Sequence, residues 1–121
     1  MTPDQFNAFC ASLPAATHVV QWGGADVWKV GGKVFAIGAW HHGKHAGITF
    51  KVSDIAYEVL REQAGLRPAP YLASRGMKWI QHYAEPGLSE ADLKDHLADS
   101  HRIVSLGLTK KLQRDLGLNQ D

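Results

Sequence analysis

The feature that most constrains the fold is a pair of adjacent glycines between two short runs rich in β-branched and aromatic residues. Residues 27–30 (Val-Trp-Lys-Val) and 33–37 (Lys-Val-Phe-Ala-Ile) flank Gly31 and Gly32. Glycine readily adopts the positive φ angles of a two-residue hairpin turn, so this segment predicts a tight antiparallel hairpin. Because side chains alternate along a strand, Trp28 is expected on one face and Lys29 on the other.

Three further segments read as strands. Residues 17–22 precede the hairpin and end at a second glycine pair, residues 46–52 follow it, and residues 79–83 (Trp-Ile-Gln-His-Tyr) form a last apolar run. The connections among the first four strands are short, which predicts an antiparallel meander.

Three segments read as helices. Thr2 and Gln5 form a capping box for the first, which Pro14 ends, and its apolar face holds Phe6, Phe9, Cys10 and Leu13. Ser53 caps the second, for which we expect Ile55, Val59 and Leu60 to face inward. Ser89 caps the third, with Leu93, Leu97, Ser100 and Val104 inward.

Together these elements predict an α+β fold over one domain, residues 1–121. We expect an antiparallel sheet of about five strands with three helices packed on one face, in the order αββββαβα. Residues 67–70 (Arg-Pro-Ala-Pro) are interpreted as an extended connection, and the end beyond Gly107 as a helical or frayed tail.

Composition limits the class of protein. The single cysteine, Cys10, permits no intrachain disulfide and is expected in the core. The first residues show no basic, apolar leader, and no apolar run approaches the roughly 20 residues needed to cross a bilayer, so we predict a cytoplasmic location. The glycine pairs lack the strand–GxGxxG–helix context of a dinucleotide site, so no cofactor is predicted.

Charge is unevenly distributed. Residues 27–84 hold eight basic and three acidic residues, whereas the two flanks together hold five basic and nine acidic ones. Such asymmetry is typical of a surface for an anionic partner, although lysines also protect exposed strand edges from aggregation.

Two histidine-containing groups are candidates for chemistry. The loop at residues 41–45 (His-His-Gly-Lys-His) has three histidines but lacks the fourth ligand of a usual zinc site, so no metal site is predicted. Asp92, His96 and Asp99 share a helical stripe that is more typical of solvated surface pairs than of a catalytic site. No catalytic residue is predicted, and an enzyme using His or Asp groups of the third helix remains a third hypothesis.

The ordered motifs resemble the MmcQ/YjbR family. The similarity runs through the hairpin at residues 29–36, the junction at 50–53 (Phe-Lys-Val-Ser) and the proline-bearing segment 67–71 with Arg75 and residues 78–80. It continues in the closing helix and the basic C-terminal segment at residues 100–111. The resemblance implies a CyaY-like α/β domain with a "double wing" arrangement, and it implies DNA binding. The run at residues 73–77 has a single arginine where the family often shows a longer basic run, and the loop at 41–45 is individual to this chain.

We therefore predict a binding module for double-stranded DNA rather than an enzyme. The predicted contact residues are Lys29, Lys33, Lys44, Lys51, Arg75, Lys78 and Trp79. Arg67 is expected at the periphery, and Trp79 or Trp40 is expected to stack or wedge. The alternative is a protein-interaction or small-anion-binding module that uses the same basic surface.

Overall fold

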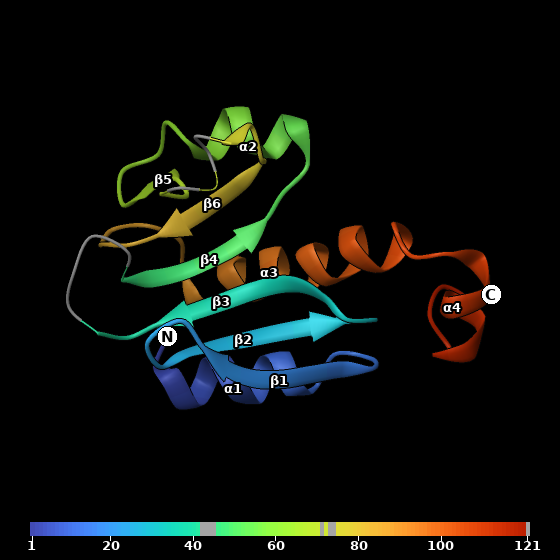
Figure 1. Ribbon diagram of the computed structural model, residues 1–121. Helices are drawn as coiled ribbons and strands as arrows, with labels where there is room; N and C mark the ends of the chain where they lie inside the picture. Colours follow the sequence, from blue (N-terminus) through green and yellow to red (C-terminus); the bar gives the residue numbers. More distant parts are fainter. Residues whose placement is uncertain (42–45, 71, 73–74, 121) are drawn as a thin grey trace.

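The structure is a computed structural model that describes residues 1–41, 46–70, 72 and 75–120. Its described part contains a six-stranded sheet in which every pair of neighbours is antiparallel (Figure 1). The strands are β1 (Ala16–Gln21), β2 (Ala25–Val30), β3 (Lys33–Ala39), β4 (Gly47–Lys51), β5 (Leu66–Pro68) and β6 (Trp79–His82). Their order across the sheet is β1-β2-β3-β4-β6-β5, so β6 inserts between β4 and the edge strand β5.

Each of the described helices is preceded by a capping residue with a hydroxyl side chain. They are α1 (Pro3–Ala11), α2 (Asp54–Leu60), α3 (Glu90–Leu106) and α4 (Lys110–Asp115). Thr2, Ser53, Ser89 and Thr109 each accept a hydrogen bond from a backbone N–H in the first turn. Gln5 also closes the predicted capping box of α1. These caps satisfy N–H groups that have no partner within the helix.

The predicted fold class is confirmed, with two additions. The segment interpreted as an extended connection contains β5, whose Pro68 pairs with Ile80 of β6. The tail beyond Gly107 contains α4. The observed order is therefore αββββαββαα. A strand of three residues that ends in one proline and is soon followed by another carries no readable alternation, which is why the sequence pattern did not reveal it.

The inward face predicted for α2 is wrong at two of its three residues. Leu60 is buried, but Ile55 is 81% exposed and Val59 is 65% exposed. Tyr57 takes the inward position instead, three residues before Leu60. In a helix of only two turns, several apolar stripes are compatible with the sequence, and docking beside β5 and β6 selects between them.

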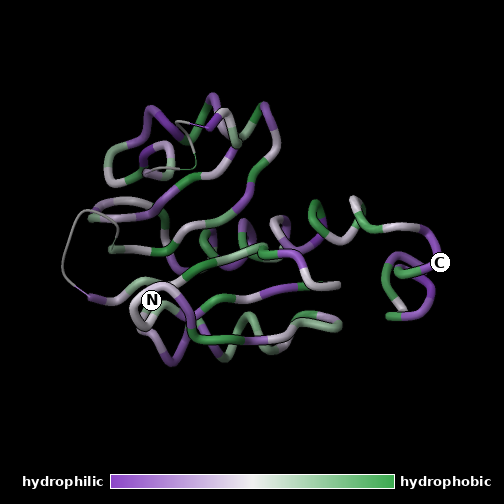
Figure 2. Tube along the Cα trace, viewed as in Figure 1, coloured by the Kyte–Doolittle hydropathy of each residue, from purple (hydrophilic) through white to green (hydrophobic). Residues whose placement is uncertain are grey.

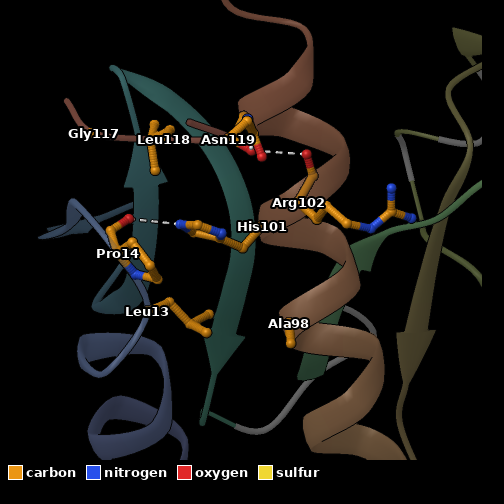
Figure 3. A pocket seen from close by; sticks show the side chains of 9 residues that line it. Leu13, Pro14, Ala98, His101, Arg102, Gly117, Leu118 and Asn119 are labelled. Atoms are coloured by element: carbon orange, nitrogen blue, oxygen red, sulfur yellow. Dashed lines mark hydrogen bonds between the residues drawn. The ribbon is translucent and has the colours of Figure 1, made fainter. Parts of the chain in front are cut away.

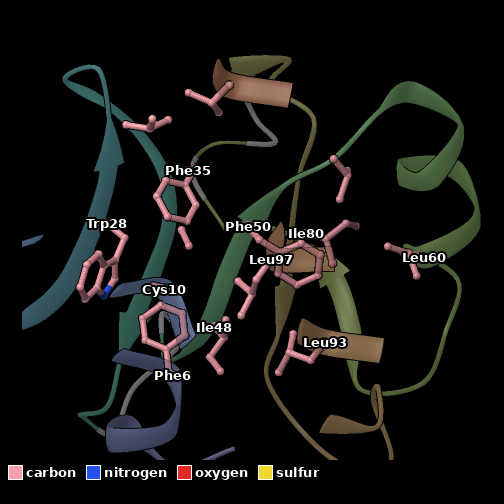
Figure 4. Close-up of a cluster of buried hydrophobic side chains, with 14 of the residues drawn as sticks. Phe6, Cys10, Trp28, Phe35, Ile48, Phe50, Leu60, Ile80, Leu93 and Leu97 are labelled. Carbon is pink, nitrogen blue, oxygen red and sulfur yellow. The ribbon is translucent and has the colours of Figure 1, made fainter. Parts of the chain in front are cut away.

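The main core lies between the sheet and the helices α1 and α3 (Figure 4). Side chains from α1, the four central strands and α3 meet there; among them are Phe6, Cys10, Trp28, Phe35, Ile48, Phe50, Ile80, Leu93 and Leu97. All four inward residues predicted for the third helix are buried. Figure 2 shows the corresponding alternation of hydrophobic and hydrophilic residues along the chain.

A bulge in β3 accounts for two consecutive buried residues. Trp28 pairs with Ala36 and Lys29 pairs with Val34, so β3 holds Phe35 as an extra residue between these partners. Phe35 and Ala36 are both fully buried. An extra residue bends a strand and lets two successive side chains turn toward one side.

The opposite face of the sheet, which we call the loop face, is bordered by the segment between β5 and β6. Pro70 and Leu72 of that segment line a cavity together with strand residues of this face, including Thr49 and Gln81. Buried residues that lie outside the main core include Ala25, Val27, Ala69 and Trp79. The loop face is therefore partly covered by chain and is not a flat, solvated sheet surface.

Candidate functional site

Two predicted contact residues share the loop face. Lys29 alternates with Trp28, whose indole nitrogen donates to Asn7 of α1 on the helix-covered side. Lys51 alternates with Phe50, whose ring stacks against His96 of α3. Because adjacent strands lie about 4.8 Å apart, the Cα atoms of these lysines, on β2 and β4, are about 10 Å apart.

Further lysines lie at the same end of the sheet, formed by the β2–β3 turn, the end of β4 and the start of β6 (Figure 1). Lys33 follows the turn and is exposed. Lys78 immediately precedes β6, and its Nζ lies 4.6 Å from the centroid of the Tyr57 ring of α2. We call Lys29, Lys33, Lys51 and Lys78 the basic end.

The backbone at Lys51 is held firmly. Its carbonyl oxygen accepts a hydrogen bond of 2.6 Å from the Ser100 hydroxyl of α3. The next residue, Val52, donates its N–H to the Lys78 carbonyl at 3.1 Å. These bonds join the end of β4 to α3 and to the start of β6, so the Lys51 and Lys78 side chains start from a defined backbone.

Trp79 is poorly placed for the stacking role expected of it. It pairs with Lys51 across β4 and β6, and the Lys51 Nζ lies 5.8 Å from its ring centroid. Its exposed fraction is only 5%, and its indole nitrogen has no hydrogen-bond partner in the part of the chain described. A buried ring offers almost no surface to a base, so we omit Trp79 from the contact set.

The other residues predicted to contact DNA or to lie beside the contacts are Arg75, Lys44 and Arg67. Arg75 is exposed in the segment before β6. Lys44 lies outside the described residues. Arg67, expected at the periphery, lies on β5; its Nε donates to Gln81 at 2.8 Å, and its guanidinium lies 4.4 Å from the Tyr83 ring centroid. Recognising β5 as a strand would have placed Arg67 beside Gln81 from the sequence.

Acidic residues are absent from the strand positions of the loop face. Asp26 is the one acidic residue within the six strands, and it lies on the helix-covered side with Trp28. The other acidic residues of the described chain belong to helices and connections. Lys29, Lys51 and Arg67 therefore share a face whose strand positions carry no negative charge.

Asp26 is the centre of a hydrogen-bond network between α1 and the first strands. Its Oδ2 accepts from the Trp40 indole at 2.7 Å and from the Asn7 amide at 3.1 Å, and its Oδ1 lies 2.7 Å from His18 Nε2. Burial by itself raises the pKa of this carboxyl, but the bonds from Trp40, His18 and Asn7 outweigh burial and lower it. Trp40, considered for stacking, is thus occupied in this network.

Of the third-helix groups considered for catalysis, Asp92 is exposed, whereas His96 and Asp99 contact other side chains. The ring of His96 stacks on Phe50, and Asp99 pairs with Arg102 at 2.6 Å. His101 donates from Nε2 to the Pro14 carbonyl at 2.7 Å beside a cavity of about 290 Å³ (Figure 3). Burial raises the pKa of the Cys10 thiol to about 12, so it carries no thiolate at neutral pH.

The histidine loop is mostly outside the described residues, which include only His41 of it, an exposed side chain. Among the described residues, no three His, Cys, Asp or Glu side chains are grouped as metal ligands would be. None of the described helices is both long and apolar enough to span a membrane.

These features define a class: an α+β domain whose antiparallel sheet is backed by helices on one face and carries lysines at one end of the other. The chain belongs to the YjbR family, whose model matches residues 11–103. Its fold is similar to the crystal structure of the Deinococcus radiodurans protein DR2400, a DUF419 domain, with a TM-score of 0.81. That match covers 97% of this chain and 88% of the other at 22% identity. A search of curated proteins found no match.

Proposed function

We propose that the chain binds double-stranded DNA, without catalysis, through phosphate contacts made by the basic end of the sheet. The observation that carries the proposal is the separation of charge between the two sheet faces, with Lys29 and Lys51 on the loop face, whose strand positions hold no Asp or Glu. The same proposal includes a double-wing arrangement in which this end of the sheet contacts the DNA, and a cytoplasmic location.

The arrangement suits a phosphate backbone better than base readout. Lys29, Lys33, Lys51 and Lys78 are separate ammonium groups on short elements, and Arg75, which is exposed, adds a fifth cation nearby in sequence. Lysine is a point charge without the planar fork that reads guanine, so such contacts position a duplex without specifying its sequence. We expect binding with little sequence preference.

The proposal predicts a steep salt dependence. With about four phosphate contacts, affinity for a duplex of about 20 base pairs falls roughly 100-fold between about 50 and 200 mM salt. A gel-shift titration at several salt concentrations measures this slope. Absence of any shift at micromolar protein and about 25 mM salt would overturn the proposal.

Lys51→Gln tests the surface itself, because removing one phosphate contact should reduce the salt slope by about 1 and weaken binding. Lys94→Gln is the matched control: Lys94 lies on α3 and pairs with Glu90, away from the basic end. Trp79→Phe is expected to leave affinity unchanged, because the buried ring makes no proposed contact. Equal weakening by Lys94→Gln would contradict the assigned surface.

The alternative, a protein or small-anion partner on the same surface, is favoured by one observation. Ile55 and Val59 form an exposed apolar pair on α2, next to Tyr57, over which Lys78 lies. Apolar residues beside a charged surface are typical of protein interfaces. Titration with tripolyphosphate separates the two: saturable binding of this short anion, together with no duplex shift, favours the alternative.

A further inference from the structure

A cavity of about 420 Å³ opens on the loop face. Its walls come from three parts of the chain: Trp22 in the β1–β2 turn, strand residues such as Ile37 and Ala39 of β3, and Leu72 after β5. Its volume lies within the range of small-molecule sites, which is about 300–1,000 Å³. None of the proposed DNA contacts lines it.

The mouth of the cavity carries an exposed indole. Trp22 lines the cavity and yet is 66% exposed, the largest exposed aromatic surface among the described residues. Its φ of +50° is unusual for a bulky side chain, and Gly23 and Gly24 that follow also have positive φ. Such a backbone is strained for a bulky residue, and residues of this kind concentrate at ligand sites.

The floor of the cavity is polar and buried. Thr49 is 7% exposed, and it is among the residues that line the cavity. Its cross-strand partner Gln81 is 2% exposed, and the Oε1 of Gln81 is held by Arg67 at 2.8 Å. Among the described residues the buried polar atoms without a partner are Trp79 Nε1 and His82 Nε2, so the Thr49 hydroxyl is open to the cavity and can donate to a ligand there.

The charges around the cavity have one sign. Lys51 lies two residues beyond Thr49 on the same side of β4, and Arg67 lies beside Gln81 on β5. No Asp or Glu is among the described residues that line the cavity. An apolar ring system with one negative group matches apolar walls, a hydroxyl donor and nearby cations.

We propose that this cavity binds a small aromatic carboxylic acid. The ring system lies between Trp22, Ile37 and Leu72, and the carboxylate accepts a hydrogen bond from the Thr49 hydroxyl within reach of the Lys51 ammonium. Only the cation is shared with the DNA proposal. The two proposals therefore fail separately: filling the cavity abolishes acid binding and leaves duplex binding intact.

Naphthalene-2-carboxylate is a suitable probe, and its uncharged amide, naphthalene-2-carboxamide, is the matched ligand control. Titration of ¹⁵N-labelled full-length protein should give saturable shifts at the Trp22 indole N–H and at the Thr49 and Leu72 amides. We expect the carboxylate to bind about tenfold more tightly than the amide, because only the acid gains a charge-assisted hydrogen bond. Equal affinity of the two ligands, or shifts confined to other residues, would overturn the proposal.

Three variants complete the test. Ala39→Phe places a ring in the cavity and should abolish the shifts, whereas Ile55→Ala, at an exposed site on α2, should not change them. Thr49→Val keeps the shape and should remove most of the preference for the acid over the amide. Binding of the acid to Ala39→Phe with unchanged affinity, in protein that keeps its thermal melting transition, would rule out this cavity as the site.

Discussion

At the scale of single residues, Asp26 shows how one carboxylate joins several elements. It holds Asn7 of α1, His18 of β1 and Trp40 after β3, and Asn7 in turn accepts from the Trp28 indole at 2.8 Å. The Asp26 side chain is 15% exposed, so the bonds from Asn7 and Trp40 are partly shielded from competing water, whereas the contact with His18 is exposed. The network fixes α1 against the first hairpin.

Asp26→Asn should lower the free energy of unfolding by about 1–3 kcal/mol at neutral pH, because charge-assisted bonds are lost and an amide N–H meets other donors. The folded pKa of Asp26 lies below its usual value, so its contribution is complete above the unfolded pKa near 3.8 and is lost as pH falls through the folded pKa. The difference between variant and parent should therefore shrink in acid.

Urea denaturation at about pH 7 and pH 3 measures this difference. Asp95→Asn, at an exposed position of α3, is the control and should change stability by less than about 0.5 kcal/mol. A variant difference that stayed the same at both pH values would assign the loss to packing rather than to the charged network.

At the scale of elements, the β2–β3 hairpin is the part of the fold that the sequence predicted best. Its turn residues Gly31 and Gly32 have φ of +58° and +80°, the left-handed values that the turn requires. The two glycines differ in their surroundings. A Cβ on Gly31 would lie 2.5 Å from Leu108 Cδ1, whereas a Cβ on Gly32 would meet nothing within 4 Å.

Gly31→Ala should therefore cost more stability than Gly32→Ala. In both variants, placing alanine in the left-handed conformation should lower the free energy of unfolding by about 1 kcal/mol. Gly31→Ala should lower it by roughly a further 1–2 kcal/mol, because the new methyl group displaces the buried Leu108. Thermal melting of the two single variants measures the difference. Equal melting temperatures would mean that Leu108 moves aside without cost.

At the scale of the whole molecule, the C-terminal segment closes the structure against its beginning. Leu118, after α4, is 3% exposed and belongs to the main core. It lines the small cavity of Figure 3 together with Leu13 and Pro14. Asn119 donates to Ser105 of α3 at 3.2 Å and to Gln113 of α4 at 2.9 Å. Residues beyond the family match at 11–103 are thus integral to this fold.

Leu118→Ala should reduce the free energy of unfolding by about 2–4 kcal/mol, the usual cost of truncating a buried leucine. Leu116→Ala is a matched control two residues away, because Leu116 is 37% exposed and should lose less than about 1 kcal/mol. Chemical denaturation of both variants compares them. Similar small losses would show that the C-terminal segment is dispensable for stability.

The sequence by itself determined the elements whose signals are local. Turn glycines, capping hydroxyls and the stripe of α3 each depend on neighbours a few residues away, so the hairpin, the helix starts and the inward residues Leu93 and Leu97 were readable. The separation of Lys29 from Trp28 onto opposite faces of β2 was readable for the same reason, because alternation depends only on adjacent residues.

Only the tertiary structure decided what covers each surface. Alternation assigns Trp79 to one side of β6 but cannot say that this side is buried, and the stripe of α2 cannot choose between Val59 and Tyr57. The residues that cover a sheet face come from segments distant in sequence, such as the segment that carries Pro70 and Leu72. Burial is a property of such long-range contacts, which carry no local period, so the loop-face cavity and the grouping of lysines at one end of the sheet became visible only in the folded chain.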